Sequence, residues 1–164
     1  MTEEEITRHI EAIVQTGIAY FKECSEHPPM LAVITDDPPT ITPISLVEFF
    51  QSHAGKVAVM ETIRDMCKTL TNIVGVVLIC EAYYKAVNLT DKEGIQRVKQ
   101  NGLHHEEERS EGLVFTIETK LKQFTRAYEI VRTSAGAHLG ERVIDDMPCQ
   151  GRFSDLISSK TSVN

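Results

Sequence analysis

The sequence predicts an α+β fold in which a mainly antiparallel sheet carries two helices packed on one face. Apolar residues recur every three or four positions in two stretches, 2–25 and 45–70, as they do along one side of a helix. The other apolar runs are short and rich in β-branched residues, which is typical of strands. Two helices are too few to supply the crossovers of a parallel sheet. We therefore expect the order α-β-β-α-β-β-β, with a possible extra C-terminal strand.

Length and composition predict a single domain. The chain has 164 residues, of which 41% are hydrophobic and 25% charged, and this balance is sufficient for one sizeable core. We expect the α+β domain to occupy residues 1–157. The last residues, 158–164, are mostly small and polar, so a disordered tail is expected there.

The first helix is expected at residues 2–25. Thr2 and Glu5 have the spacing of a capping box, in which each side chain accepts a hydrogen bond from the backbone N–H of the other residue. Two prolines at 28 and 29 follow the end of this helix. The apolar stripe that would face the sheet consists of Ile6, Ile10, Ile13, Gly17, Tyr20 and Cys24.

Two short strands are expected next, at residues 30–35 and 40–44, joined by a turn rich in Asp and Pro. Pro43 has no N–H to donate to a neighbouring strand, so the second strand is expected at an edge of the sheet. The second helix should follow at residues 45–70, with Ser45 and Glu48 as another capping box and a wide apolar arc. Gly55 inside it predicts a bend or a close contact.

The strongest strand prediction is residues 73–87. Its first half is apolar at every position, which is typical of a central strand buried on both faces. Residues 88–110 are polar and charged and are expected to form a long, mobile loop. Another strand is expected at 113–121, where polarity alternates. Residues 123–133 fit a strand or a helix; we favour a strand because Thr, Tyr, Ile and Val dominate.

Charge and the N-terminal residues bear on partners and location. The net charge is −7, with 17 basic and 24 acidic residues, and the sequence has no dense basic run. We therefore expect neither a nucleic-acid partner nor a membrane partner. The first residues are acidic, unlike a signal peptide, and the longest apolar run is too short to span a bilayer. A cytoplasmic, acidic protein is the expectation.

Glu81 and Glu118 are the candidate catalytic pair. Each is expected in the middle of a strand on its more polar face, and the two strands could be neighbours. Two carboxylates that lie close together raise one pKa, which suits general acid–base chemistry. The alternative interpretation is a solvent-facing sheet surface with cross-strand ion pairs.

His104 and His105, followed by three glutamates, are the candidate metal ligands, because imidazole and carboxylate groups bind zinc and iron. A solvated charged loop is the alternative, since adjacent residues point apart. The four cysteines have no C-x-x-C spacing and are interpreted as buried thiols. The sequence contains no glycine-rich nucleotide motif, and no cofactor is expected.

Three functions are left open by these patterns. The favoured one is a non-catalytic interaction or adaptor domain that forms a homodimer or another homo-oligomer, because a sheet with both helices on one face leaves its other face to be covered. One alternative is a small-molecule-binding regulatory domain, with its pocket on the open sheet face beside residues 88–110. The other is a small hydrolase that uses the paired carboxylates or a metal.

Overall fold

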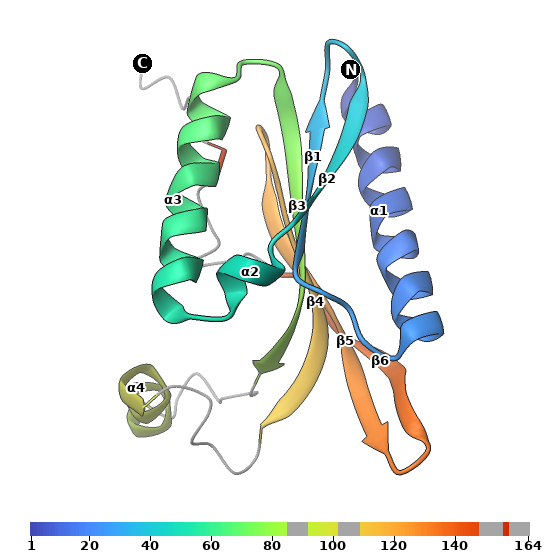
Figure 1. Ribbon diagram of the computed structural model, residues 1–164, viewed down its shortest axis with the longest axis vertical. Coiled ribbons are helices and arrows are strands. Elements are labelled where there is room, and N and C mark those ends of the chain that lie inside the picture. The colour runs from blue at the N-terminus through green and yellow to red at the C-terminus, as the bar shows by residue number, and fades with distance from the viewer. Residues whose placement is uncertain (85–91, 102–108, 148–155, 158–164) are drawn as a thin grey trace.

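The computed structural model describes residues 1–84, 92–101, 109–147 and 156–157 (Figure 1). Its elements follow one another in the order α1 (Glu3–Cys24), β1 (Met30–Thr35), β2 (Thr40–Ser45), α2 (Val47–Phe50), α3 (His53–Thr69), β3 (Ile73–Tyr84), α4 (Lys92–Asn101), β4 (Ser110–Thr119), β5 (Gln123–Thr133) and β6 (Gly136–Met147). Among these helices, none has the length and apolar character needed to cross a membrane.

The six strands form one antiparallel sheet in the order β2-β1-β3-β4-β5-β6. The predicted α+β class and antiparallel sheet are confirmed. β2, which contains Pro43, lies at one edge, and β3 lies between β1 and β4 as a central strand. The possible C-terminal strand is present as β6 at the other edge, and the strand interpretation of residues 123–133 is confirmed as β5.

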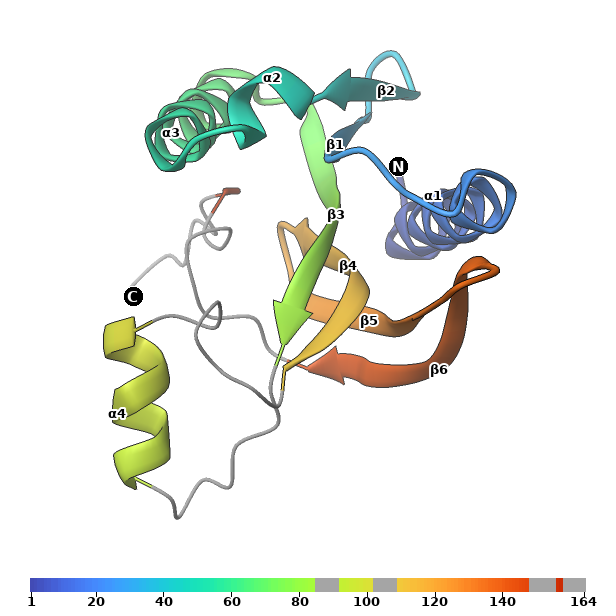
Figure 2. The same cartoon turned by 60° about the horizontal axis from the view of Figure 1, so that its bottom comes forward.

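The two long helices lie on opposite faces of the sheet, so the prediction that both pack on one face is wrong (Figure 2). The core beneath α1 includes Ala32 and Val77, whereas the core beneath α3 includes Leu31 and Leu78. Successive side chains of a strand point to opposite faces, so these are two separate cores. β1 and β3 are apolar on both faces, and each face needs its own cover.

α1 begins as the sequence predicts, but its buried stripe is different. Glu5 Oε2 accepts a 2.7 Å hydrogen bond from Thr2 N–H, and Thr2 Oγ1 accepts one of 3.2 Å from Glu5 N–H, which completes the capping box. Phe21 is fully buried, while Tyr20 is 42% exposed and Cys24 is exposed. The buried residues are Ile10, Ile13, Val14, Gly17 and Phe21, a stripe that keeps helical spacing.

The predicted helix at 45–70 is divided into α2 and α3. Ser45 pairs with Met30 in the sheet and does not cap a helix, so the second capping box is wrong. Ser52 caps α3 instead, and its Oγ accepts a 3.0 Å hydrogen bond from Gly55 N–H. A Cβ atom at Gly55 would collide with the main-chain oxygen of Phe49, which confirms the close contact expected there.

The loop prediction for residues 88–110 is wrong over Lys92–Asn101, which form α4. This segment is rich in Lys, Glu, Gln and Arg, and these polar residues are also good helix formers. Polar composition alone therefore does not distinguish an exposed helix from a loop. The loop prediction is also wrong at Ser110, which begins β4, whereas residues 88–91, 102–108 and the tail at 158–164 lie outside the described residues.

Candidate functional site

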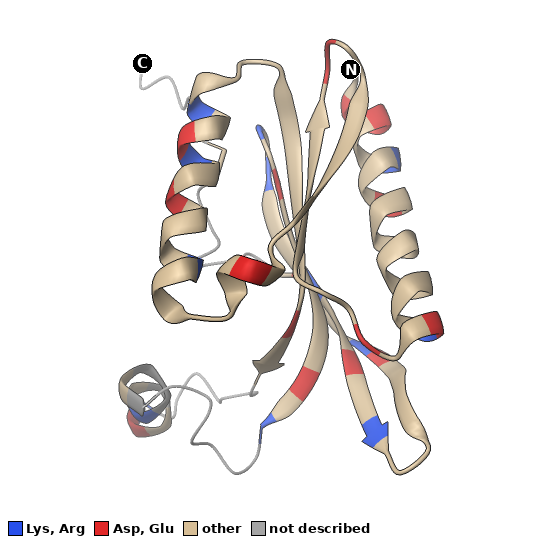
Figure 3. Cartoon of the chain, viewed as in Figure 1, with Lys and Arg blue, Asp and Glu red and all other residues tan. Residues whose placement is uncertain are grey.

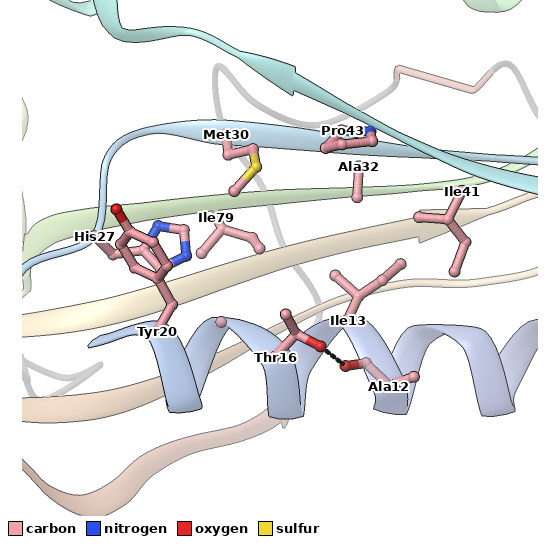
Figure 4. Close-up of a pocket in the computed structure, with 11 residues that line it drawn as sticks. Ala12, Ile13, Thr16, Tyr20, His27, Met30, Ala32, Ile41, Pro43 and Ile79 are labelled. Carbon is pink, nitrogen blue, oxygen red and sulfur yellow. Dashed lines mark hydrogen bonds between the residues drawn. The ribbon is translucent and has the colours of Figure 1, made fainter. Parts of the chain in front are cut away.

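A pocket of about 340 Å³ opens between α1 and the edge of the sheet formed by β1 and β2 (Figure 4). This volume falls at the lower end of the range for ligand pockets. Its walls are largely apolar and include Ile13, Met30, Ala32, Ile41, Pro43 and Ile79. We call this the α1–β2 pocket.

Small residues allow α1 to approach the sheet at one wall of this pocket. A Cβ atom at Gly17 would lie 2.9 Å from Cε1 of Phe115 and 3.5 Å from Cδ1 of Ile79. Ala12 on the helix and Ala32 on β1 also line the pocket. Their short side chains leave a space between layers that are otherwise in close contact.

His27 lines the pocket and is itself buried. Its residue is 4% exposed, and its Nδ1 lies 2.7 Å from the main-chain oxygen of Pro28. A carbonyl oxygen only accepts, so Nδ1 must carry the proton and donate. The other ring nitrogen, Nε2, is then an acceptor, and no group within the described part of the chain hydrogen-bonds to it.

The imidazole of His27 is held in its neutral form. Burial lowers its pKa below the ordinary value of 6.5, and this effect outweighs the opposing influence of the Pro28 carbonyl and the Glu81 carboxylate. A neutral ring with Nδ1 protonated has its lone pair on Nε2.

Tyr20 lies beside His27 at the exposed side of the pocket (Figure 4). The two ring centroids are 5.2 Å apart, and the rings meet edge to face at 63°. A hydrogen bond with Cys24 raises the pKa of the Tyr20 hydroxyl above its ordinary value. The aromatic ring thus stays uncharged at the mouth of the pocket.

Glu81 on β3 holds His27 in place from the sheet. Its Oε1 accepts a 2.6 Å hydrogen bond from the main-chain N–H of His27, and its Oε2 accepts one of 2.6 Å from Arg132 on β5. Arg132 also donates to both carboxylate oxygens of Glu111 on β4, at 2.7 and 2.8 Å, and this pairing lowers the pKa of Glu111. Acidic and basic positions accordingly lie side by side at this end of the three strands (Figure 3).

Comparison of this chain with known protein families, with curated proteins and with solved structures finds no match. What the pocket and the predicted site residues can do is therefore inferred from their geometry.

The structure does not bring Glu81 and Glu118 together. Glu81 pairs across the sheet with Leu113, and Leu113 is five positions from Glu118 on β4. Five positions correspond to roughly 16 Å along a strand, and an odd separation places the two side chains on opposite faces. This distance is too long for two carboxylates to act on one bond.

Glu118 has a structural role in the described residues. Its side chain is buried at 3% exposure on the face covered by α3. Its two carboxylate oxygens accept hydrogen bonds from the main-chain N–H groups of Leu156, at 2.9 Å, and Ile157, at 2.5 Å. Leu156 and Ile157 thereby complete the core beneath α3.

The remaining predicted ligands give no metal centre within the residues that the structure describes. His104 and His105 lie outside those residues, and elsewhere no group of three or more His, Cys, Asp or Glu side chains could hold a metal ion. The buried-thiol prediction holds for Cys80, whose pKa burial raises to about 11. It is wrong for Cys24, which is exposed.

The sequence interpretation missed His27 as a pocket residue. In the sequence, His27 stands between a helix end and two prolines, a position that indicates only a connection. Its contact with Glu81 joins residues 54 positions apart. The one local signal is the following Pro28, whose carbonyl fixes the tautomer of the ring.

Proposed function

We propose that this protein is a small-molecule-binding domain whose ligand occupies the α1–β2 pocket. The observation that carries this proposal is the α1–β2 pocket itself, a cavity of about 340 Å³ with largely apolar walls. His27 lines it as a buried residue whose main chain is held by the Glu81 carboxylate.

The fixed position of His27 also supports a binding function. Its main chain is tied to Glu81, and Glu81 is tied to Arg132 on a third strand. Residues held in place before binding lose little conformational freedom when the ligand arrives, so more of the contact energy contributes to affinity. Ligand pockets commonly combine apolar walls with a small number of fixed polar groups.

The expectation of a self-associating adaptor has lost one of its premises. It depended on an open sheet face, and in the described part of the chain α1 and α3 cover opposite faces of β1 and β3. The homo-oligomer and the cytoplasmic location stay predictions from the sequence. A pocket within one chain needs no second copy, so the binding proposal can be tested without them.

A thermal-shift screen of small, neutral, mainly hydrocarbon compounds tests the proposal. A compound present at about ten times its Kd should stabilise the folded state by about 1.4 kcal/mol, which raises the Tm of a chain of this size by about 3–6 °C. A library that produces no shift of this kind would overturn the proposal.

Two variants of α1 locate the binding site. Ala12→Phe adds a large side chain at the pocket wall and should abolish the shift. Ala19→Phe is the matched control, because Ala19 is exposed on the same helix and is not among the lining residues. If Ala12→Phe keeps the full shift, the compound binds elsewhere and the α1–β2 pocket is not the site.

A further inference from the structure

We propose that the α1–β2 pocket holds one linear, uncharged alkyl chain of about nine carbon atoms. This inference rests on the proposed function and concerns the shape and charge of the ligand that the same pocket accepts. The length of the pocket, its width and the charges near one of its ends support it.

The pocket is elongated along α1. Ala12 and Tyr20, eight positions apart on the helix, both line it, and eight residues of helix span about 12 Å. The opposite wall has a similar length, because it extends from Met30 to Ile41, which pairs with Ile34, and four strand positions span about 13 Å. Tyr20 and Met30 lie toward one end of the pocket, and Ala12 and Ile41 lie toward the other (Figure 4).

The pocket is narrow for its length. A volume of about 340 Å³ divided by a length of about 12 Å gives a mean cross-section of about 28 Å², or a width of about 5 Å. Non-bonded carbon atoms approach one another to about 4 Å, so a single extended chain can occupy this width. A saturated ring or a branched chain places carbon atoms side by side and needs roughly 2 Å more. The dimensions therefore favour a linear chain.

The length of the pocket sets the length of the chain. C–C bonds of about 1.5 Å that zigzag at the tetrahedral angle advance about 1.3 Å per carbon atom. A pocket of about 12 Å therefore holds about nine carbon atoms. Each methylene group that leaves water for the apolar walls contributes to affinity, whereas a carbon atom beyond the end of the pocket stays in water.

The surroundings of the pocket favour an uncharged ligand. In the described part of the chain no Lys, Arg, Asp or Glu side chain lines it, so a charged group inside would lose hydration without gaining an ion pair. At the Tyr20 end, the hydrogen bond with Cys24 raises the pKa of the Tyr20 hydroxyl, and the negative charges of Glu26 and Glu23 raise it further. Two carboxylates that act on Tyr20 would also repel a carboxylate head group at this end.

A series of straight-chain alcohols tests the length of the chain. We would measure by calorimetry the Kd values of the 1-alkanols from 1-hexanol to 1-dodecanol. The affinity should rise by up to about fourfold for each added carbon atom and then reach a plateau near 1-nonanol. Unspecific association with apolar surface has no such plateau. An affinity that rises steadily as far as 1-dodecanol would overturn the proposal.

Two matched comparisons test the shape and the charge of the ligand. 1-Octanol and cyclooctanol have the same number of carbon atoms, and 1-octanol should bind more tightly after correction for their partition between water and hydrocarbon. 1-Nonanol should likewise bind more tightly than nonanoate at neutral pH. Equal or tighter binding of cyclooctanol would exclude the linear shape, and equal or tighter binding of nonanoate would exclude the uncharged ligand.

Two variants at the Ala12 end should move the plateau in opposite directions. Ala12→Val fills part of this end and should shift the plateau to shorter chains, whereas Ile41→Ala opens it and should shift the plateau to longer ones. Both positions are exposed, so the fold should tolerate the changes. Ala19→Val is the matched control on the same helix, because Ala19 is exposed and does not line the pocket. A plateau that stays at the same chain length in both variants would show that this pocket does not set it.

The outcomes separate the two proposals. If none of the alcohols binds, the proposed function and this inference both fail. If the alcohols bind without a plateau, or if cyclooctanol binds as tightly as 1-octanol, the linear chain is overturned, while binding in the pocket stands.

Discussion

The main-chain N–H of His27 donates a 2.6 Å hydrogen bond to Oε1 of Glu81. The second oxygen of the same carboxylate accepts from Arg132, so Glu81 joins the connection after α1 to the middle of the sheet. Hydrogen bonds to ionised groups are stronger than those between neutral groups. Glu81, a candidate acid or base in the sequence, therefore sets the position of the imidazole in the pocket.

Replacing Glu81 should weaken the fold at the pocket. Glu81→Ala removes the partner of His27 N–H and one of the two carboxylate partners of Arg132, and we expect the free energy of unfolding to fall by about 2 kcal/mol. Glu81→Gln keeps an acceptor for His27 and should lose less. Urea denaturation measures both values. Glu141→Ala, at an exposed position of β6, is the control and should change stability by less than about 0.5 kcal/mol. Unchanged stability in Glu81→Ala would contradict this role.

Gly17 is the second position where a small change should be costly. A Cβ atom there would lie 2.9 Å from the ring of Phe115, which is fully buried. Although alanine favours a helix over glycine by about 1 kcal/mol, we expect Gly17→Ala to destabilise the protein by about 1–3 kcal/mol through overpacking. Denaturation midpoints give the value.

The same substitution in a Phe115→Leu background provides the control for Gly17→Ala. The smaller side chain makes room for the new methyl group, so the cost of Gly17→Ala should be lower there, and the two changes should be non-additive. An equal cost in both backgrounds would show that the contact with Phe115 is not its cause.

The positions of the strands could be predicted because their signals are local. Pro43 cannot donate a hydrogen bond to a second neighbour, which places β2 at an edge. The first half of β3 is apolar at every position, which requires cover on both faces. Taken further, the same observation favours one helix on each face, because two helices on one face would leave the second face of β3 without cover from the same chain.

The site could not be predicted because it depends on long-range register. A shift of one residue in the pairing of two strands moves every side chain to the other face. The sequence therefore allowed Glu81 and Glu118 to meet, whereas the observed register separates them. Likewise, His27 lines a pocket only because α1, β1 and β2 come together around it.

Glu118 should be essential for holding the segment that contains Leu156 and Ile157. Glu118→Ala leaves two buried main-chain N–H groups without their acceptor, and we expect a loss of about 2–4 kcal/mol in the free energy of unfolding. A chain that ends at residue 155 removes the same contacts from the other side. Because both changes break one interaction, their combined cost should be smaller than the sum of the two.

A chain that ends at residue 157 is the control for this truncation, since it keeps Leu156 and Ile157. Urea denaturation of the unmodified protein, Glu118→Ala, the chain that ends at residue 155 and the variant that combines both changes gives the coupling energy between Glu118 and the segment. Strictly additive costs would show that Glu118 stabilises the fold without acting through Leu156 and Ile157, in conflict with the observed hydrogen bonds.

The buried imidazole of His27 should make stability depend on pH. Burial lowers the pKa of His27 below 6.5 in the folded protein, whereas an unfolded chain ionises at about 6.5. Between these two values the unfolded chain binds a proton that the folded chain does not. The contribution to stability is therefore complete above the unfolded pKa and is lost as the pH falls through the folded pKa.

Comparison of the unmodified protein with His27→Phe isolates this effect. From about pH 7.5 to about pH 5, the unmodified protein should lose more free energy of unfolding than the variant, by at most about 1.4 kcal/mol per pH unit for one proton. Glu111 and Asp146, whose pKa values are lowered by Arg132 and Arg126, also reduce stability on acidification, but they do so in both proteins. Parallel stability profiles would show that folding leaves the pKa of His27 unshifted, in conflict with the burial of its ring.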